Sequence, residues 1–519
     1  MSTRINNNMN PHSEFVAPEM LPRDAYNARL ISLVHPPQWQ NPPSQPRYNL
    51  VVVGAGTAGL NCAAAVAGLG GKVALIERHL MGGDCLNVGC VPSKMMIRSA
   101  RVMADFRNAE EFGVRPPSVL NADFGLAMER MRRLRARISQ HDSAARFKEL
   151  GVDVFFGEAR FLGPDAVEVG GLTLRFAKAV IATGARAVTP DIPGLAQAGY
   201  LTNETIFNLT QRPSRLLVIG GGPLGCELAQ AFHRLGSTVI IIQREPRFLP
   251  QEEREAAQLL AQSFQRDGIQ LHLNTEVQRV ERSEQGKVVH LLKEARETAV
   301  TTDEILVGAG RAPNVEGLNL EAAEVRYDDT IGVHVNDFLQ TSNPAIYAAG
   351  DVCLATKYTH MAEASARIVV QNALFRGRKR LSALTIPWCT FTDPEIAHVG
   401  LYVRQAHEKK IPVKTYTVPM NDVDRAITDG EEGGFVKIHV EAGSDRILGA
   451  TIVGRHAGEM INEISLAMVA RVGLKTIGGV IHSYPTQAEA IRRAADAYNK
   501  TRLTPLLKRF TTRWLAWTR

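Results

Sequence analysis

The sequence predicts an α/β fold with two Rossmann-like nucleotide-binding domains, followed by a C-terminal α+β domain. Two observations lead to this prediction. An apolar strand followed by a glycine-rich turn and a helix occurs twice, near residues 50 and 215, and strand-like runs alternate with helices between residues 385 and 500. The length of 519 residues exceeds what one hydrophobic core supports, which agrees with several domains.

The composition excludes several other classes of protein. Hydrophobic residues at 45% and charged residues at 22% are ordinary for a globular chain, and 43 glycines with 26 prolines exclude collagen-like and low-complexity sequences. Six cysteines are too few for a disulfide-rich scaffold. The formal net charge of +7, if spread evenly, is too small for a nucleic-acid-binding surface, so we expect no nucleic-acid partner.

The N-terminal residues 1–47 predict an irregular extension, because Asn and Pro are frequent and no apolar segment of a signal peptide occurs. Residues 50–76 are apolar enough to resemble a membrane span. Their glycines, and the charged residues that follow, favour a strand, a turn and a buried helix instead. We therefore expect a cytoplasmic protein.

The first glycine motif directly follows a predicted buried strand. Gly54 permits a tight turn, Gly56 lets a pyrophosphate approach the backbone, and Gly59 allows close packing of the helix on the strand. A second strand then ends at Glu77, 23 positions after Gly54, where a carboxylate can accept hydrogen bonds from ribose hydroxyls. Strand, turn, helix and acid together predict a dinucleotide site.

The second glycine motif repeats the first one. Gly220, Gly222 and Gly225 occupy the same three positions after an apolar strand, and Gln243 again lies 23 positions after the first glycine. The two units predict strands at residues 49–53, 72–76, 215–219 and 238–242, and helices that end near residues 69 and 235.

The two motifs differ at the ribose position. A carboxylate such as Glu77 repels a 2′-phosphate, whereas neutral Gln243 beside Arg244 accommodates one, with Arg247 nearby. The first site therefore suits FAD or NAD, and the second suits NADP(H). The alternative is that Arg244 and Arg247 are solvated surface arginines.

A cysteine pair follows the first unit. Cys85 and Cys90 cannot bond across a regular helix, because an axial rise of about 7.5 Å exceeds the usual Cα separation of about 4.4 to 6.8 Å. A bond needs an irregular turn, for which Gly89 and Pro92 are suited. Zinc sites use shorter gaps and a second pair, so we predict no metal site. A cytosolic disulfide is more often redox-active than structural, and Lys94 would stabilise a thiolate four positions earlier.

Two further features predict structure rather than chemistry. Cys62, Cys226, Cys353 and Cys389 are expected to be small buried apolar residues. Residues 102–149 predict an arginine-rich helix with a solvated face. Its arginines include Arg130, Arg132, Arg133, Arg135 and Arg137.

The last 28 residues contain eight basic residues and one acid, so the net charge of the whole chain is concentrated there. Leu506, Phe510, Trp514 and Trp517 recur at helical spacing. This pattern predicts a short basic amphipathic helix, suited to an anionic membrane surface or an acidic partner. The alternative is that the helix packs against the body of the protein.

Residues 83–94, with the sequence GDCLNVGCVPSK, resemble the signature of the class I pyridine nucleotide–disulfide oxidoreductases. These are flavoproteins such as dihydrolipoamide dehydrogenase, glutathione reductase and mercuric reductase. The resemblance extends over about residues 48–502. It includes, in the same order, residues 182–184, residues 310–314, Thr341 with residues 346–351, and residues 482–486 with Glu489.

The resemblance implies a domain plan. It consists of an FAD-binding domain in two parts (48–198 and 310–384), an NAD(P)-binding domain (199–309), a dimerisation domain (385–500) and a tail (501–519) after the N-terminal extension (1–47). The dimerisation domain contains predicted strands at residues 435–440 and 447–453 and a predicted helix at residues 460–472.

The resemblance also implies roles for the site residues. Cys90 would face the flavin and form a charge-transfer thiolate, Cys85 would exchange with the substrate, and Lys94 would pair with Glu227 near the flavin. The residues implied for FAD are Gly54, Gly56, Gly59, Glu77, Lys94, Gly184, Gly310 and Asp351. Those implied for NADPH, with NADH as a possible donor, are Gly220, Gly222, Gly225, Glu227 and Arg244.

The final motif implies a homodimer with shared active sites. His482 would reach the cysteines of the partner subunit as a general acid–base, oriented by Glu489. The expected activity is NADPH-dependent reduction of a small disulfide or similar sulfur substrate. Thiol-bound Hg(II) is the alternative acceptor, although the cysteine pair that typically ends mercuric reductases is missing after Cys389. A flavin-bearing sensor with little turnover is the third hypothesis.

Overall fold

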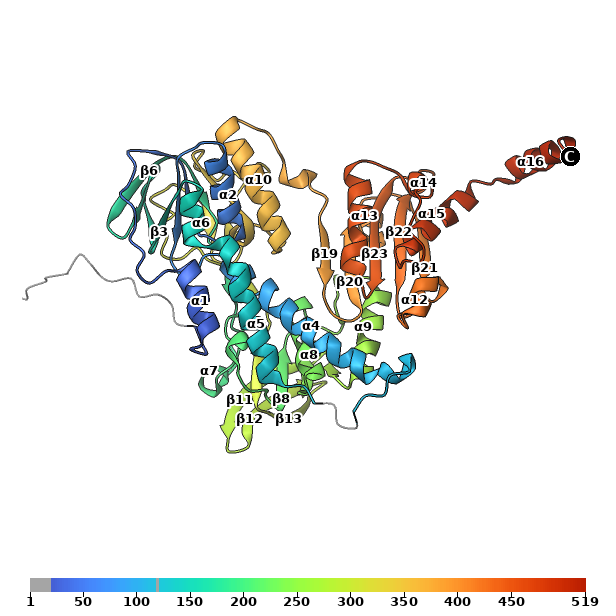
Figure 1. Ribbon diagram of the computed structural model, residues 1–519, viewed down its shortest axis with the longest axis horizontal. Coiled ribbons are helices and arrows are strands. Elements are labelled where there is room, and N and C mark those ends of the chain that lie inside the picture. Colours follow the sequence, from blue (N-terminus) through green and yellow to red (C-terminus); the bar gives the residue numbers. More distant parts are fainter. Residues whose placement is uncertain (1–19, 118–120) are drawn as a thin grey trace, which may run out of the picture.

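The computed structural model describes residues 20–117 and 121–519 (Figure 1). The first three-quarters of these residues form two sheet-containing bodies with helices packed around them, and the last quarter forms a separate antiparallel sheet covered by helices. The predicted α/β fold class with a C-terminal α+β domain is confirmed. Within the described ranges, no helix has both the length and the apolar character that crossing a membrane requires.

The first sheet has the strand order β3-β2-β1-β6-β5-β4, with β18 also paired to β6. Its parallel part places the central strand β1 between β2 and β6, and the glycine turn follows β1 directly. All six residues of β1 except Asn49 are buried, as expected for a parallel strand covered on both faces. The strands are β1 (Tyr48–Val53), β2 (Val73–Glu77), β3 (Val152–Phe156), β4 (Ala159–Gly163), β5 (Ala166–Val169), β6 (Leu172–Ile181) and β18 (Ile346–Ala348).

Helices α2 (Thr57–Gly68) and α10 (Thr359–Phe375) pack side by side against the first sheet (Figure 1). They belong to one apolar core although 290 residues of sequence lie between them. The chain therefore returns to the first sheet through β18 after forming the second body. This return brings Asp351 and Thr359 close to the first glycine turn and the cysteine pair.

The second body repeats the arrangement on a parallel sheet of order β10-β9-β8-β14. The predicted strands β8 (Arg215–Ile219) and β9 (Thr238–Ile242) are present with the expected bounds. Helix α8 (Pro223–Arg234) follows the second glycine turn, and α9 (Arg254–Asp267) leads to the sheet edge. The remaining strands are β10 (Gln270–His272), β14 (Glu304–Val307) and an antiparallel sheet of β11 (Glu276–Ser283), β12 (Gly286–Lys293) and β13 (Arg296–Thr302).

Two short strands connect the bodies. β7 (Ala185–Ala187) pairs antiparallel with β15 (Arg311–Pro313), where the chain leaves and re-enters the first body. Because the pair is antiparallel, Gly184 and Gly310 lie at its opposite ends. The Gly184 carbonyl accepts from the Asn314 N–H at 3.0 Å, and the Gly310 carbonyl accepts from the Val188 N–H at 3.1 Å. A second short pair joins β16 (Tyr327–Asp328) to β17 (Gly332–Val333).

The C-terminal domain is a five-stranded antiparallel sheet of order β19-β20-β23-β22-β21. Its apolar core is shared with α13 and α15. The strands are β19 (Pro387–Thr390), β20 (Glu395–Gly400), β21 (Val413–Pro419), β22 (Phe435–Glu441) and β23 (Ile447–Gly454). The helices are α11 (Val403–Glu408), α12 (Asp424–Thr428), α13 (Ala457–Val469), α14 (Leu474–Ile477), α15 (Glu489–Thr501) and α16 (Pro505–Trp517).

The prediction of an irregular N-terminal extension is wrong for part of its length. Residues 1–19 lie outside the described residues, but Ala25–Val34 forms helix α1, capped by the Asp24 side chain. Leu30 and Val34 are fully buried in the core of the first body. Leu30 and Val34 are four residues apart, about one helical turn, so both lie on the face of α1 that packs against the core. The frequent Asn and Pro residues of this segment gave no indication of that face.

The arginine-rich segment also differs from its prediction. It is not one helix but α4 (Cys90–Arg107), α5 (Phe124–Ile138) and α6 (Ala144–Glu149), and its face is not uniformly solvated. Arg132 and Arg135 are buried, Arg135 with 0% of its surface exposed. The Arg135 guanidinium donates to the Asn27 side chain at 2.8 Å and to the Asn87 carbonyl at 2.6 Å. This arginine thereby joins α1 to α3 (Gly83–Asn87), the short helix that contains Cys85.

We expect Asn27→Leu to lower the free energy of unfolding by about 2 kcal/mol, because a buried cation loses a hydrogen-bond acceptor. Thermal unfolding of the holoenzyme measures this effect as a lower transition midpoint. Arg133→Met is the matched control, since Arg133 is exposed on the same helix as Arg135. Equal midpoints for Asn27→Leu and wild type would show that α1 does not support α3.

The four isolated cysteines follow their prediction in part. Cys62 and Cys226 are fully buried in the helices after the two glycine turns. Cys353 and Cys389 are half-buried and contact apolar cores.

Candidate active site

The first glycine turn has the geometry of a nucleotide-binding cradle. Gly54 adopts a φ of 103°, and a Cβ atom there would lie 2.4 Å from the Ala182 carbonyl oxygen. A Cβ on Gly59 would lie 1.8 Å from the Gly54 oxygen, so helix α2 can approach β1 only with glycine at this position. Among the described residues, no side chain caps α2 at Gly56, which leaves the first N–H groups of the helix available to an anion. These residues fit the pyrophosphate of a dinucleotide.

Glu77 is the last residue of β2 and lies next to the first glycine turn. Its carboxylate accepts from the Ala55 N–H at 2.7 Å and from the His79 N–H at 2.8 Å. Burial raises the pKa of Glu77. Two backbone donors fix the carboxylate at the position expected for ribose recognition.

The second glycine turn has the same geometry. Gly220 adopts a φ of 109°, and a Cβ on Gly225 would lie 2.1 Å from the Gly220 oxygen. At the ribose position, Gln243 is buried and donates to the Arg247 carbonyl at 2.6 Å. Arg244 extends into solvent, with Glu245 4.0 Å away. A buried neutral side chain next to an exposed guanidinium fits a 2′-phosphate better than it fits two ribose hydroxyls.

The two cysteines lie on either side of a break between helices. Cys85 is within α3, Val88 and Gly89 leave the helical conformation, and Cys90 begins α4. A Cβ on Gly89 would lie 2.8 Å from the Asp84 oxygen, so glycine is required at this break. The predicted irregular turn is confirmed. Both cysteines are free thiols in the structure, with Cys85 half-buried and Cys90 exposed.

The two thiols have opposite acidities. A hydrogen bond from Cys85, supported by Thr359 and by the charge of Lys94, lowers the pKa of Cys90 to about 6. The same hydrogen bond, together with burial, raises the pKa of Cys85. Within the reduced pair, the shared hydrogen bond therefore favours the proton on Cys85 and the negative charge on Cys90.

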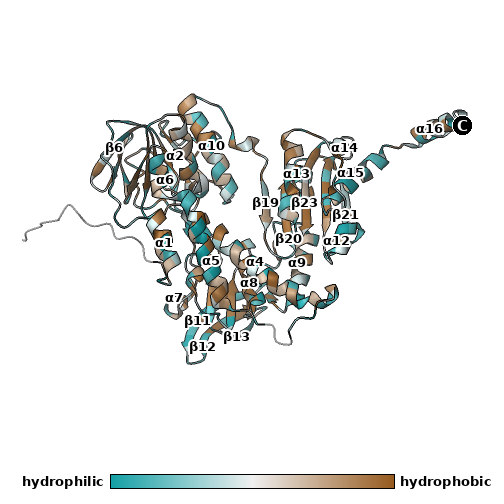
Figure 2. Ribbon diagram, in the orientation of Figure 1, coloured by the Kyte–Doolittle hydropathy of each residue, from teal (hydrophilic) through white to brown (hydrophobic). Residues whose placement is uncertain are grey.

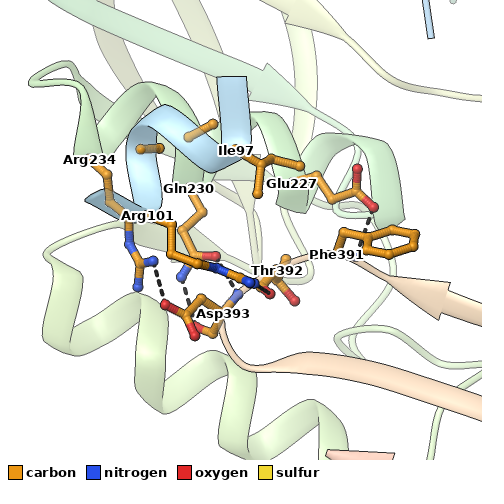
Figure 3. A pocket seen from close by; sticks show the side chains of 10 residues that line it. Ile97, Arg101, Glu227, Gln230, Arg234, Phe391, Thr392 and Asp393 are labelled. Atoms are coloured by element: carbon orange, nitrogen blue, oxygen red, sulfur yellow. Dashed lines mark hydrogen bonds and ion pairs between the residues drawn. The ribbon is translucent and has the colours of Figure 1, made fainter. Parts of the chain in front are cut away.

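Lys94 and Glu227 form the pair that the sequence predicted, with 2.7 Å between Nζ and Oε2. Glu227 is buried at the lining of a small cavity, and its other oxygen accepts from the Phe391 N–H at 2.9 Å (Figure 3). The Lys94 ammonium also lies 4.6 Å from the centre of the Phe391 ring. Residues from α4, α8 and the C-terminal domain thus hold one positive charge four positions from Cys90.

Arg311 was not predicted as a functional residue, yet it connects two parts of the site. It bonds to Asp84, next to Cys85, and its Nε lies 3.6 Å from Asp351 Oδ2. Burial raises the pKa of Asp351, and the ammonium of Lys357 donates to the Asp351 carbonyl at 2.7 Å. The sequence signal for this role was the position of Arg311 in the motif at residues 310–314.

Thr359 is a second residue that sequence reasoning missed. It is the first residue of α10, and its hydroxyl lies 3.2 Å from the Cys90 sulfur. The contact joins positions 269 residues apart, so no local pattern could reveal it. This contact places the Cys90 sulfur next to the N-terminus of α10, which follows Asp351 in the chain.

We expect Thr359→Val to raise the pKa of Cys90 by about one unit, because a hydrogen bond to a charged acceptor contributes ~1.5 kcal/mol. The fraction of thiolate would then rise at higher pH than in wild type. The rate of Cys90 alkylation in the reduced enzyme, followed against pH, measures this shift. Thr428→Val, an exposed substitution on α12, should leave the profile unchanged. An unshifted profile for Thr359→Val would exclude the hydroxyl as a donor to Cys90.

The predicted pairing of His482 with Glu489 is wrong within the described protomer. The His482 ring lies 3.0 Å from Glu463 of α13, and its side chain is 7% exposed. Glu489 begins α15, so its carboxylate faces the next helical turn and binds Arg492 and Arg493. The family resemblance implied Glu489, but the fold supplies Glu463 from a different helix.

Tyr484 is the exposed titratable side chain of this segment. It is 70% exposed, and its hydroxyl donates to Asp424 at 2.9 Å. That hydrogen bond raises the pKa of Tyr484. In the sequence, the position of Tyr484 directly before Pro485 in the final motif was the feature that could have marked it as a candidate site residue.

Known proteins resemble this chain over most of its length. Residues 48–367 match the family model described as pyridine nucleotide-disulphide oxidoreductase, and residues 386–495 match its dimerisation domain. A mercuric reductase of Staphylococcus aureus is 35% identical over 453 residues, covering 87% of this chain and 83% of the relative. A dihydrolipoyl dehydrogenase of Thermus scotoductus is 34% identical over 467 residues, covering 87% and 98%.

A solved structure shows the same fold. The HOCl-induced flavoprotein disulfide reductase RclA from Escherichia coli has a TM-score of 0.78 at 28% identity, covering 86% of this chain and 99% of the other. The resemblance seen in the sequence motifs is therefore confirmed. The chain belongs to the pyridine nucleotide–disulfide oxidoreductase family, whose enzymes use FAD and NAD(P)H.

Proposed function

We propose that the protein catalyses NADPH-dependent reduction of a small disulfide, or of a similar sulfur substrate, at Cys85 and Cys90. The observation that carries this proposal is the pair of adjacent thiols with opposite acidities, close to Lys94 and Thr359. A buried structural pair would need no such difference. An anionic sulfur next to a protonated one suits thiol–disulfide exchange.

The two glycine turns hold the cofactors in this proposal. FAD, when bound, supplies the transfer of two electrons from the nicotinamide to the cysteine pair. The residues that would hold it are Gly54, Gly56, Gly59, Glu77, Lys94, Gly184, Gly310 and Asp351. Those that would hold NADPH are Gly220, Gly222, Gly225, Glu227 and Arg244, and NADH would be a weaker donor for lack of a 2′-phosphate.

The chain's own residues carry out the exchange. The Cys85 sulfur attacks one sulfur of the substrate, which forms a mixed disulfide and releases the first thiol with the Cys85 proton. The Cys90 thiolate then attacks Cys85, which re-forms the protein disulfide, and the second thiolate takes a proton from solvent. The hydrogen bond from Cys85, with a contribution from the charge of Lys94, favours the Cys90 thiolate until the mixed disulfide forms. The net reaction consumes NADPH, one proton and one disulfide, and yields NADP⁺ and two thiols.

A homodimer is part of the proposal. The C-terminal domain exposes an apolar surface on α13 and on the segment after α14, where Ile481 is 97% exposed. Leu466, Val469 and Val480 belong to the same surface. Covering these residues with a second copy would remove apolar surface from water. It would also bring the exposed Tyr484 towards a partner, whereas His482 is covered in its own protomer.

Thiol-bound Hg(II) is a second candidate acceptor, favoured by the position of His482. A phenol stays protonated near neutral pH, so Tyr484 is a poorer proton shuttle than an exposed imidazole. The proton transfer expected at the active site of a disulfide reductase would therefore be less efficient. In addition, the Staphylococcus aureus relative is named a mercuric reductase. That reaction would convert NADPH, Hg(II) dithiolate and one proton into NADP⁺, Hg(0) and two thiols.

A panel of acceptors separates these functions. NADPH oxidation by the holoenzyme is measured with an aromatic disulfide, lipoamide, oxidised glutathione, and Hg(II) with excess thiol, and again with NADH. Reduction of a disulfide supports the first function, and stimulation by Hg(II) alone supports the second. Retained FAD with no reduced acceptor would contradict both and indicate a sensor. If His482→Gln loses more disulfide-dependent NADPH oxidation than Tyr484→Phe does, His482 and not Tyr484 is the proton shuttle.

A further inference from the structure

The C-terminal helix α16 extends away from the body of the protein. Figure 1 shows it beyond α15, separated by a short connection, and none of its residues is buried. Leu506 is 77% exposed and Trp517 is 78% exposed. The alternative that this helix packs against its own protomer is therefore wrong.

One face of α16 is apolar. At about 100° per residue, positions 506, 510, 514 and 517 fall within one arc, and Leu507 lies at its edge. The rings of Trp514 and Trp517 lie 5.3 Å apart on this arc. Figure 2 shows α16 apart from the sheets and helices of the protein body, and its large apolar side chains are exposed instead of being buried in a core.

The rest of the helix is basic. No acidic residue occurs after Asp496 in the sequence, whereas six cations follow it. They are Lys500, Arg502, Lys508, Arg509, Arg513 and Arg519. Positive charge around an apolar arc is complementary to a surface that is both anionic and apolar.

The residues at the start of α16 favour helix formation. The Thr504 side chain caps its N-terminus by accepting from the Leu507 N–H, and Pro505 occupies the first turn. A helix of 13 residues is nevertheless marginal in water without tertiary contacts. Binding through the apolar arc would supply the missing contacts.

We propose that α16 lies on an anionic lipid bilayer. The apolar arc would enter the boundary between headgroups and acyl chains, where indole rings are favoured. The cations would contact lipid phosphates. A groove on another protein would accept the arc too, but it would not need several cations beside the arc together with two indoles. The bilayer meets all three features.

Co-sedimentation of the full-length holoenzyme with vesicles tests this proposal. Phosphatidylcholine vesicles with and without phosphatidylglycerol are compared at low and high salt. We expect binding only to the vesicles with phosphatidylglycerol, and weaker binding at high salt. Lys508→Gln with Arg509→Gln and Arg513→Gln should weaken binding by about 100-fold. Trp514→Ser with Trp517→Ser should abolish the shift in tryptophan emission on binding.

A matched control removes three charges elsewhere. Arg376, Arg378 and Lys379 are exposed cations in a loop without an apolar helix, so replacing all three by Gln should leave binding unchanged. All variants should retain wild-type NADPH oxidation without vesicles, which shows that they are folded. Absent binding to phosphatidylglycerol, or an equal loss in the control, would overturn the proposal. A change in oligomeric mass on deleting residues 505–519, without vesicle binding, would assign α16 to a second copy instead.

Discussion

Replacing Cys90 by serine is expected to reduce NADPH-dependent turnover of any acceptor by about 10³-fold or more. The physical reason is the position of its sulfur. It lies 3.2 Å from the Thr359 hydroxyl, receives the Cys85 proton in a hydrogen bond, and has a pKa of about 6. A serine hydroxyl in that place does not ionise at neutral pH and cannot form a disulfide. Steady-state kinetics with saturating NADPH measures the loss.

Two variants make this prediction specific. Cys85→Ser should lose turnover to a similar extent but keep a reactive Cys90, so that alkylation of Cys90 persists. Its pKa should rise, because the largest cause of its acidity is the hydrogen bond from Cys85. Cys389→Ser, which alters a half-buried thiol outside the pair, should keep nearly all activity. Full activity in Cys90→Ser would mean that electrons reach the acceptor without the pair.

The second large effect concerns the nucleotide. We expect Arg244→Glu to lower kcat/KM for NADPH by about 100-fold, because a carboxylate at this exposed position repels the 2′-phosphate. The value for NADH should change much less, so the ratio of the two donors reports the effect. Arg296→Glu reverses an exposed charge on β13 of the same body and should leave the ratio unchanged. A wild-type enzyme that prefers NADH would contradict the assignment of Arg244.

The features predicted well from the sequence are those fixed by local geometry. Gly54 and Gly59 must be glycines because a Cβ would strike the backbone at 2.4 Å and 1.8 Å. Such requirements leave a pattern in a short stretch of sequence. The same holds for the break at Gly89 between the cysteines. The bounds of β8 and β9 were predicted because buried parallel strands read as continuous apolar runs.

The features predicted poorly depend on contacts between distant segments. Arg135 was assigned to a solvated face because arginine is usually exposed, yet Asn27 and Asn87 provide acceptors in the core. The family resemblance implied Glu489 as the partner of His482, while Glu463 of α13 is the residue that the fold places there. Thr359 leaves no local signal because its partner Cys90 is 269 residues away.

Electrons are expected to pass from NADPH to the Cys85–Cys90 pair, and anaerobic titration of the holoenzyme with NADPH measures this transfer. A long-wavelength charge-transfer band should appear in wild type, since the Cys90 thiolate is the expected electron donor to the flavin. The band should be absent in Cys90→Ser and unchanged in Cys389→Ser. Wild-type enzyme that is fully reduced by NADPH without ever showing this band would contradict the account.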